Sequence, residues 1–262
     1  MKTRLSPENP YGFTRCGYAW ENIPAGSAAH LDVGCHDGAF LASLRSKGIS
    51  RLAGVDVARG PIDRARRQFP DLEFQHVAED RPLPFADGTF SSATLLDVIE
   101  HVYDQARLLS EVNRVLLPGG RLIITVPRRY LFSFLDLGNL KFVFPRLHRT
   151  FYCLTHSRSD YDQRYVHNPD GLVGDVSARK RRHEHFSQDA LAALLARSGF
   201  EPESFDGSGF FARPLSPATK LGMLVPGLRG MMRAISRTDA RRFESMNLFC
   251  TARKDRPAVS AS

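Results

Sequence analysis

Short apolar runs alternate along the chain with amphipathic segments, starting near residue 29. The apolar runs are residues 30–34, 51–57, 72–77, 91–99 and 121–127. Continuous rather than alternating hydrophobicity indicates strands that are buried on both faces, as in a parallel sheet. The amphipathic segments between them predict helices over residues 38–48, 61–69 and 103–116. This alternation favours an α/β fold with a doubly wound, mostly parallel sheet.

The pattern continues after a long interruption. Residues 188–198 predict a helix, with Ser187 as its N-cap and Gly199 as its stop. Strands are expected at 201–207 and 246–254. We therefore divide the chain into four parts, of which the third contains a basic insertion at 213–242. The parts are an N-terminal segment with the ligand-binding half of the sheet (1–127), an aromatic and basic helical insertion that caps the sheet (128–182), the remainder of the same domain (183–254) and a disordered tail (255–262).

Composition and charge narrow the picture. The formal net charge is +8 and 42% of the residues are hydrophobic, which is enough for one sizeable core. No signal peptide and no long uncharged apolar stretch is visible, so a cytoplasmic protein is expected. The four cysteines form no C-x-x-C pair, which argues against a thiolate zinc site.

A turn with two glycines follows the first predicted strand, in the stretch LDVGCHDGAF. A strand that runs into such a turn and then a helix is a general design for nucleotide sites. The turn has neither the G-x-G-x-x-G spacing nor a G-K-[ST] motif, so a dinucleotide site and a P-loop are both disfavoured. In a parallel sheet, ligands bind beyond the carboxyl ends of the strands, where Asp32, Asp56 and Asp97 lie in the sequence.

Five motifs in order resemble the class I S-adenosylmethionine-dependent methyltransferases, and in particular their small-molecule, ubiquinone-biosynthesis-like branch (methyltransferase type 11). They are LDVGCHDG, GVDV, LPFADGTFSSATLLDVIEHV, EVNRVLLPGGRLIITVP and HEHFSQDALAALLARSGF. The resemblance covers about residues 29–127 well and 183–206 loosely. It implies a seven-stranded Rossmann-like sheet, S-adenosylmethionine as cofactor and methyl transfer as the reaction.

The resemblance also implies a set of cofactor-binding residues, in which Asp56 holds the ribose hydroxyls. The set is Asp32, Gly34, Cys35, His36, Gly38, Asp56, Val57, Ala78, Glu79 and Asp97. The competing interpretation of Asp56 is a helix N-cap. The chain departs from the family pattern at His36, which replaces a glycine, and at Val77, which stands where an adenine-binding aspartate is common. Histidine is among the non-glycine residues that tolerate a positive φ, so we expect the turn to survive.

Two histidines are the candidate catalytic bases, His101 and His185, because a neutral imidazole can accept a proton near pH 7. For both residues a structural turn before a helix is the alternative. A third interpretation is a divalent metal held by Asp97, Glu100 and His101, with a further histidine from position 183 or 185.

The sequence favours a small-molecule acceptor that is methylated on a hydroxyl and is anionic or lipid-linked, since arginines follow the fifth strand. Leucine, methionine and arginine mix at 221–237, as in a lid or in an interfacial helix that contacts a membrane. Two other functions stay open, an RNA methyltransferase and a catalytically silent partner subunit. No RNA-binding module is visible, so nucleic acid is not expected as a partner. The oligomeric state is left open.

Overall fold

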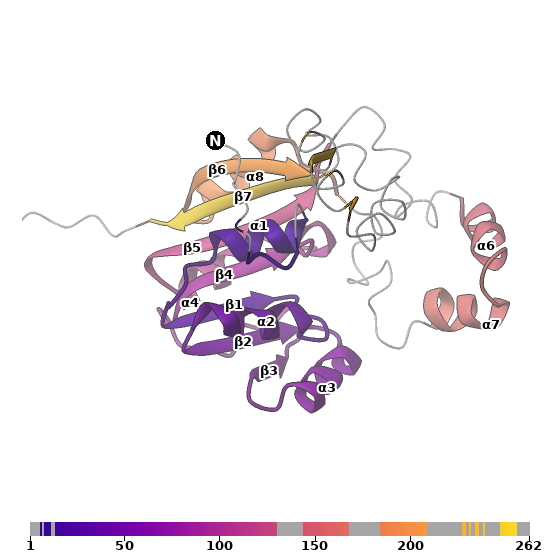
Figure 1. Cartoon of the computed structure of the whole chain (residues 1–262), viewed down its shortest axis with the longest axis horizontal. Coiled ribbons are helices and arrows are strands. Elements are labelled where there is room, and N and C mark those ends of the chain that lie inside the picture. Colours follow the sequence, from indigo (N-terminus) through magenta and orange to yellow (C-terminus); the bar gives the residue numbers. More distant parts are fainter. Residues whose placement is uncertain are drawn as a thin grey trace, which may run out of the picture.

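A seven-stranded sheet forms the centre of the computed structural model, with strand order β3-β2-β1-β4-β5-β7-β6 (Figure 1). The structure describes residues 6, 8–11, 14–129, 144–167, 184–208, 227–228, 231, 234–235, 238 and 247–255. The strands are β1 Ala29–Val33, β2 Arg51–Asp56, β3 Glu73–His76, β4 Phe90–Leu96, β5 Leu116–Pro127, β6 Phe200–Ser208 and β7 Asn247–Lys254. Strands β1 to β5 are parallel and β7 is antiparallel to both neighbours. The doubly wound, mostly parallel sheet is confirmed.

Helices cover both faces of this sheet. They are α1 Arg15–Asn22, α2 Ala39–Ser43, α3 Arg59–Gln68, α4 Gln105–Val115 and α8 Gln188–Arg197. Two further helices, α6 Pro145–Cys153 and α7 Arg158–Tyr161, belong to the segment between β5 and α8. One core cluster joins the sheet to α4 and α8, and contains Leu109, Val112 and Leu195. The second joins the other face to α1, α2 and α3, and contains Tyr18, Leu41 and Ile62. Among the described residues, no helix is long and apolar enough to cross a membrane.

The order of the strands decides where a ligand can bind. After β1 the chain builds β2 and β3 on one side, and then returns to add β4 on the other side of β1. This reversal leaves a crevice at the carboxyl ends of β1 and β4, because their following loops turn in opposite directions. The loops that begin at Gly34, Val57 and Asp97 therefore converge at one edge of the sheet.

Local signals placed most element ends correctly, with one correction. Ser187 caps α8 by accepting a hydrogen bond from the Ala190 amide (3.1 Å), and Gly199 has φ +75° after it. The helix predicted over 103–116 is α4, which begins after its N-cap Asp104. The strand predicted over 121–127 begins earlier, before the turn signal Pro118-Gly119-Gly120. Strand β5 already begins at Leu116, which pairs with Phe90, and the register shift between Phe90 and Ser92 absorbs the intervening residues.

The two insertions lie largely outside the described residues. The described part of 128–182 is helical, and Figure 1 shows α6 and α7 standing apart from the sheet. Within 213–242, the described Leu228, Met231 and Ile235 are exposed by 39–49%, so core packing is not found at these three positions. The tail from 256 onward also lies outside the described residues. The domain boundaries, the cap and the membrane contact stay predictions.

Candidate functional site

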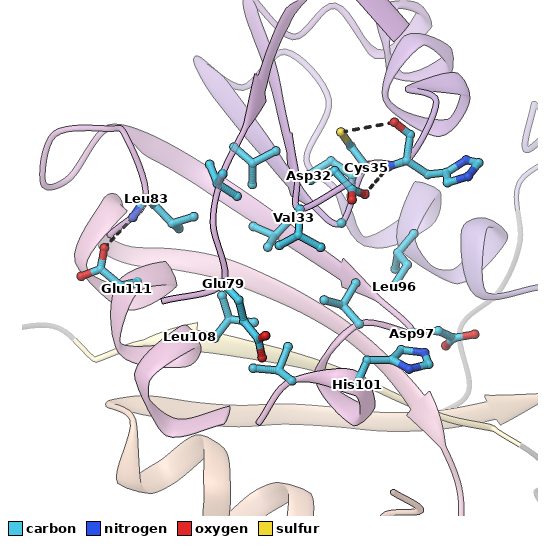
Figure 2. A pocket seen from close by; sticks show the side chains of 18 of the residues that line it. Asp32, Val33, Cys35, Glu79, Leu83, Leu96, Asp97, His101, Leu108 and Glu111 are labelled. Atoms are coloured by element: carbon cyan, nitrogen blue, oxygen red, sulfur yellow. Dashed lines mark hydrogen bonds between the residues drawn. The ribbon is translucent and has the colours of Figure 1, made fainter. Parts of the chain in front are cut away.

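A cavity of about 520 Å³ opens at the carboxyl ends of β1, β2 and β4, a size typical of small-molecule sites (Figure 2). Nine of the ten residues predicted to bind the cofactor line it. They are Asp32, Gly34, Cys35, His36, Asp56, Val57, Ala78, Glu79 and Asp97. The candidate base His101 lines it as well. These residues come from the carboxyl ends of β1 to β4 and from the loops that follow them, which the parallel topology brings together.

The loop after β1 takes the left-handed conformation at Gly34 (φ +80°), His36 (φ +49°) and Gly38 (φ +76°). The expected tolerance of His36 for a positive φ is therefore confirmed. A Cβ at Gly34 would lie 2.4 Å from Cγ2 of Val98, so only glycine fits there. Gly38 is not among the cavity-lining residues. A Cβ at Gly38 would lie 2.5 Å from the Phe74 ring, which indicates a packing role between α2 and β3.

Asp56 ends β2 with its side chain at the cavity, and the residue is only 5% exposed. Its Oδ2 accepts a hydrogen bond from the His36 amide and its Oδ1 accepts one from the Ala58 amide, both at 2.8 Å. Each carboxylate oxygen can accept a second hydrogen bond. The N-cap residue of α3 is Ala58 and not Asp56, so Asp56 ties two loops together and keeps acceptor capacity for a ligand.

Asp32 is buried beneath the same loop, 3% exposed, with its Oδ1 accepting a hydrogen bond from Thr94 Oγ1 (2.7 Å). Burial, together with the charge of nearby Asp56, raises the pKa of Asp32 to about 7, although the hydrogen bond from Thr94 and the charge of Arg15 lower it. A cation that binds in the cavity would lower the pKa of this carboxyl again, because a positive group nearby favours the ionised form.

We expect Asp32→Asn to be more favourable for stability at pH 8 than at pH 5, when the unliganded variant is compared with the unliganded wild type at each pH. The folded-state pKa of about 7 exceeds the unfolded value of 3.8, so the stability that Asp32 contributes is present below pH 4 and is lost as the pH rises through 7. The variant lacks this loss, and its advantage in free energy of unfolding should grow by about 2–4 kcal/mol between the two pH values. Urea unfolding at both pH values measures it, and parallel pH curves for the variant and the wild type would contradict it.

Asp97 follows β4 in a strained conformation, with φ +55°. Its amide donates to the Thr125 carbonyl (3.0 Å), and its Oδ1 accepts from Thr125 Oγ1 (2.7 Å). Its Oδ2 forms an ion pair with Arg15 at the start of α1. Left-handed conformations of non-glycine residues cluster at functional sites. The sequence reasoning missed Arg15, because α1 is short and its only start signal is the N-cap Thr14.

His101 lies one turn beyond Asp97, and Figure 2 shows both side chains at one end of the cavity. Its Nε2 is 3.9 Å from Oε1 of the buried Glu100. His185 does not line the cavity, but its segment lies close by, since the Glu184 amide donates to the Glu100 carbonyl (3.5 Å). The proposed catalytic role of His185 stays a prediction.

Much of the remaining lining of the cavity is apolar. Val57, Val77 and Val102 contribute to it, and Glu79 supplies a carboxylate whose Oε1 accepts from the Tyr103 amide (3.2 Å). An aromatic ring with a few polar edges fits such a lining. Further lining residues that the sequence did not indicate are Cys16, Phe40, Arg81, Leu83, Leu96, Val98, Arg107, Leu108 and Glu111.

The residues present fit S-adenosylmethionine. The molecule has a ribose, an adenine, and a methionine end with an ammonium, a carboxylate and a sulfonium. Asp56 offers spare acceptors for ribose hydroxyls, Asp32 and Asp97 offer negative charge, and Arg15 offers a partner for a carboxylate. For a metal, we find no group of three histidine, cysteine or acidic side chains with suitable placement within the described ranges.

Comparison with known proteins agrees with this fit. Residues 31–124 match the family model "Methyltransferase domain". A Mycolicibacterium smegmatis protein named "probable S-adenosylmethionine-dependent methyltransferase" is 32% identical over 133 residues, 49% of this chain and 50% of the relative. A ubiquinone biosynthesis O-methyltransferase of Pseudomonas paraeruginosa is 28% identical over 142 residues, 48% of this chain and 59% of the relative.

The fold has counterparts among solved structures. The S-adenosylmethionine-dependent methyltransferase from Mesorhizobium loti superposes with a TM-score of 0.55 at 19% identity, covering 92% of this chain and 99% of that one. This likeness shows the fold alone. The chain spans about half the length of the curated relatives that it matches. Together, the motifs, the cavity and the family match identify residues 31–124 as a methyltransferase domain, similar to that of S-adenosylmethionine-dependent methyltransferases.

Proposed function

We propose that the chain transfers the methyl group of S-adenosylmethionine to a hydroxyl group of a small molecule. The observation that carries this proposal is the single cavity in which Asp56, Asp32 and Asp97 follow one another along the carboxyl ends of three neighbouring strands. Two curated relatives, from Pseudomonas and Penicillium, carry O-methyltransferase in their names, which supports oxygen as the acceptor atom.

Each part of the cavity has a task in this proposal. Asp56 accepts hydrogen bonds from both ribose hydroxyls, and Val57, Val77 and Val102 contact the adenine. Arg15 pairs with both Asp97 and the methionine carboxylate. Asp97 and Asp32 face the ammonium of the methionine end. When bound, the cofactor supplies a methyl group that its sulfonium has already activated. The remaining work is alignment, because an in-line displacement needs the acceptor oxygen, the methyl carbon and the sulfur in one line.

His101 acts as the base that accepts the hydroxyl proton of the acceptor. Its side chain lines the cavity at the Asp97 end and is 19% exposed, so an acceptor can reach it. Buried Glu100 lies behind it and stabilises the imidazolium that forms. The arginines that follow β5, Arg128 and Arg129, do not line the described cavity. The proposal of an anionic or lipid-linked acceptor is therefore supported by the net charge of +8 and not by these two arginines.

His101→Ala should lower kcat by about 10²-fold or more and leave binding of S-adenosylhomocysteine nearly unchanged. The reason is that the side chain handles the acceptor proton and not the cofactor. Initial rates at saturating S-adenosylmethionine measure kcat, and calorimetric titration measures the binding of S-adenosylhomocysteine. Asp71→Ala, at an exposed residue that does not line the cavity, is the control. Unchanged turnover of His101→Ala would remove this residue as the base.

The function itself is tested in two stages. Calorimetric titration of the whole chain with S-adenosylhomocysteine comes first, and absence of binding would overturn the proposal. A screen of phenolic, glycosidic and lipid-linked hydroxyl compounds with methyl-labelled cofactor follows, with and without a chelator. Transfer that requires an added divalent cation would assign Asp97, Glu100 and His101 to a metal instead. Binding without transfer to any acceptor, or transfer to total RNA alone, would favour the silent partner subunit or the RNA methyltransferase, respectively.

A further inference from the structure

Four polar side chains form a row in the core beneath the cavity. His30 and Asp32 lie two positions apart on β1, and Ser92 and Thr94 lie opposite them on β4. All four point to the same face of the sheet, since alternate strand residues share a face. His30, Ser92 and Thr94 are completely buried. A buried strand of a parallel sheet is otherwise apolar, so a histidine here requires an explanation.

Hydrogen bonds join the four side chains into one chain. His30 Nδ1 is 2.9 Å from Ser92 Oγ, and His30 Nε2 is 3.1 Å from Thr94 Oγ1. Thr94 Oγ1 in turn donates to Asp32 Oδ1 at 2.7 Å. The chain of contacts therefore starts in the middle of the sheet and ends on a carboxylate that lines the cavity.

The ionised carboxylate determines the direction of every hydrogen in this chain. A carboxylate only accepts, so the Thr94 hydroxyl must donate its hydrogen to Asp32. The Thr94 oxygen is then left to accept, which requires the hydrogen of the imidazole to be on Nε2. The free Nδ1 of His30 accepts from the Ser92 hydroxyl. Burial and the nearby Lys47 lower the pKa of His30 to about 3, so the ring stays neutral at physiological pH.

We propose that His30 is a positioning residue of the cofactor site, which holds the Thr94 hydroxyl in the orientation that donates to the Asp32 carboxylate. This inference rests on the proposed function, in which Asp32 faces the cofactor's ammonium as an anion. Without the donated hydrogen bond, Asp32 takes up a proton more readily and offers the ammonium no charge. A histidine that only made hydrogen bonds in the core would affect stability alone, whereas this role affects ligand binding in the cavity.

The charged and titratable groups around Asp32 do not replace this hydrogen bond. Arg15 on α1 favours the ionised form of Asp32, but its guanidinium already pairs with Asp97. Asp56 on β2 favours the protonated form. The other titratable side chains that interact with Asp32 are neutral at pH 7, namely Tyr11, Cys16 and Cys35, since the pKa of each is raised above its ordinary value. Ionisation of Asp32 therefore depends on the hydrogen bond that the neutral Thr94 hydroxyl donates.

The test is the pH dependence of S-adenosylhomocysteine binding, measured by calorimetry from pH 5.5 to 9. In the wild type, affinity should rise with pH as Asp32 ionises. Thr94→Val should move the midpoint of this rise upward by about one pH unit, which is the effect of losing one hydrogen bond to a charged group. His30→Leu should move it in the same direction by a smaller amount. Thr94→Ser and His30→Gln, which keep the donors, should remain within about 0.3 pH unit of the wild type.

Thr251→Val is the matched control, because Thr251 is also a buried threonine in the sheet but lies on β7, where it bonds Ser204. It should lose stability without moving the midpoint. Equal midpoints in the wild type, Thr94→Val and His30→Leu would overturn the inference. If His30→Leu does not fold, Thr94→Val carries the test.

A second measurement does not depend on the cofactor. Long-range ¹H–¹⁵N spectra of the unliganded protein at pH 8 should show His30 with its hydrogen on Nε2, and no change toward the doubly protonated ring down to pH 5.5. A ring protonated on Nδ1 instead would overturn the inference. Because these spectra need no ligand, they test the role of His30 separately from the proposed function. A failure of the proposed function would instead appear as a wild type that does not bind S-adenosylhomocysteine.

Discussion

Replacing Asp56 with alanine is expected to weaken S-adenosylhomocysteine binding by roughly 10²–10³-fold, because two hydrogen bonds to a charged acceptor are lost. The carboxylate is 5% exposed, lines the cavity, and already accepts from the His36 and Ala58 amides. Removing the carboxylate also leaves the buried Ala58 amide without its acceptor. The variant should therefore show a higher Kd in calorimetry and also a lower thermal stability.

The matched control is Asp71→Ala, which removes an exposed aspartate that pairs with Arg45 away from the cavity. Its affinity should equal that of the wild type. Asp56→Asn adds a graded test, since an amide keeps one acceptor oxygen and loses the charge; its Kd should fall between those of the wild type and the alanine variant. Wild-type affinity in Asp56→Ala would place the ribose elsewhere and would end the present assignment of the cavity.

Replacing Gly34 with alanine is expected to lower the free energy of unfolding by about 2–5 kcal/mol, combining left-handed strain with overpacking. The residue has φ +80°, and the added Cβ would lie 2.4 Å from Cγ2 of Val98 on the far side of the crevice. Pushing Val98 away displaces the loop between β4 and α4, so S-adenosylhomocysteine affinity should fall as well. Urea unfolding and calorimetry measure the two effects.

Gly26→Ala separates the two causes. Gly26 also has a positive φ (+65°), but its added Cβ would meet nothing within 4 Å, so only the strain of about 1–2 kcal/mol should remain. The double variant Gly34→Ala/Val98→Ala tests the steric part directly, because it removes the atom that clashes. Part of the affinity lost in Gly34→Ala should return. Equal destabilisation in Gly34→Ala and Gly26→Ala would contradict the steric explanation.

The parallel sheet could be predicted because its signals are local. Continuous apolar runs marked β1, β2, β4 and the second half of β5, and Ser187 and Gly199 marked the ends of α8. The start of β5 could not be predicted in the same way. Pro118-Gly119-Gly120 is a strong turn signal, but the pairing of Leu116 with Phe90 begins the strand earlier. Pairing partners distant in sequence overrode the local preference.

The candidate site also contains residues that the sequence could predict and residues that it could not. Nine of the ten expected cofactor residues line the cavity, because each follows a strand whose carboxyl end faces the crevice. Gly38 is the exception, since a glycine required by the Phe74 ring has the same sequence signal as one required by a ligand. Arg15 was missed because only the packing of α1 on the sheet brings it to Asp97, 82 positions later. We expect the insertions 128–182 and 213–242 to shape the acceptor pocket, and neither contains a sequence motif that indicates the acceptor.

Strand β7 has a consequence for how the protein is made. Its Asn247 pairs with Pro127 of β5, about 120 positions earlier, and β7 alone connects β6 to the rest of the sheet. A ribosome adding roughly 5–20 residues per second leaves the outer edge of β5 open for on the order of ten seconds. During synthesis, that bare backbone edge is a template for pairing with other chains until β7 emerges from the exit tunnel.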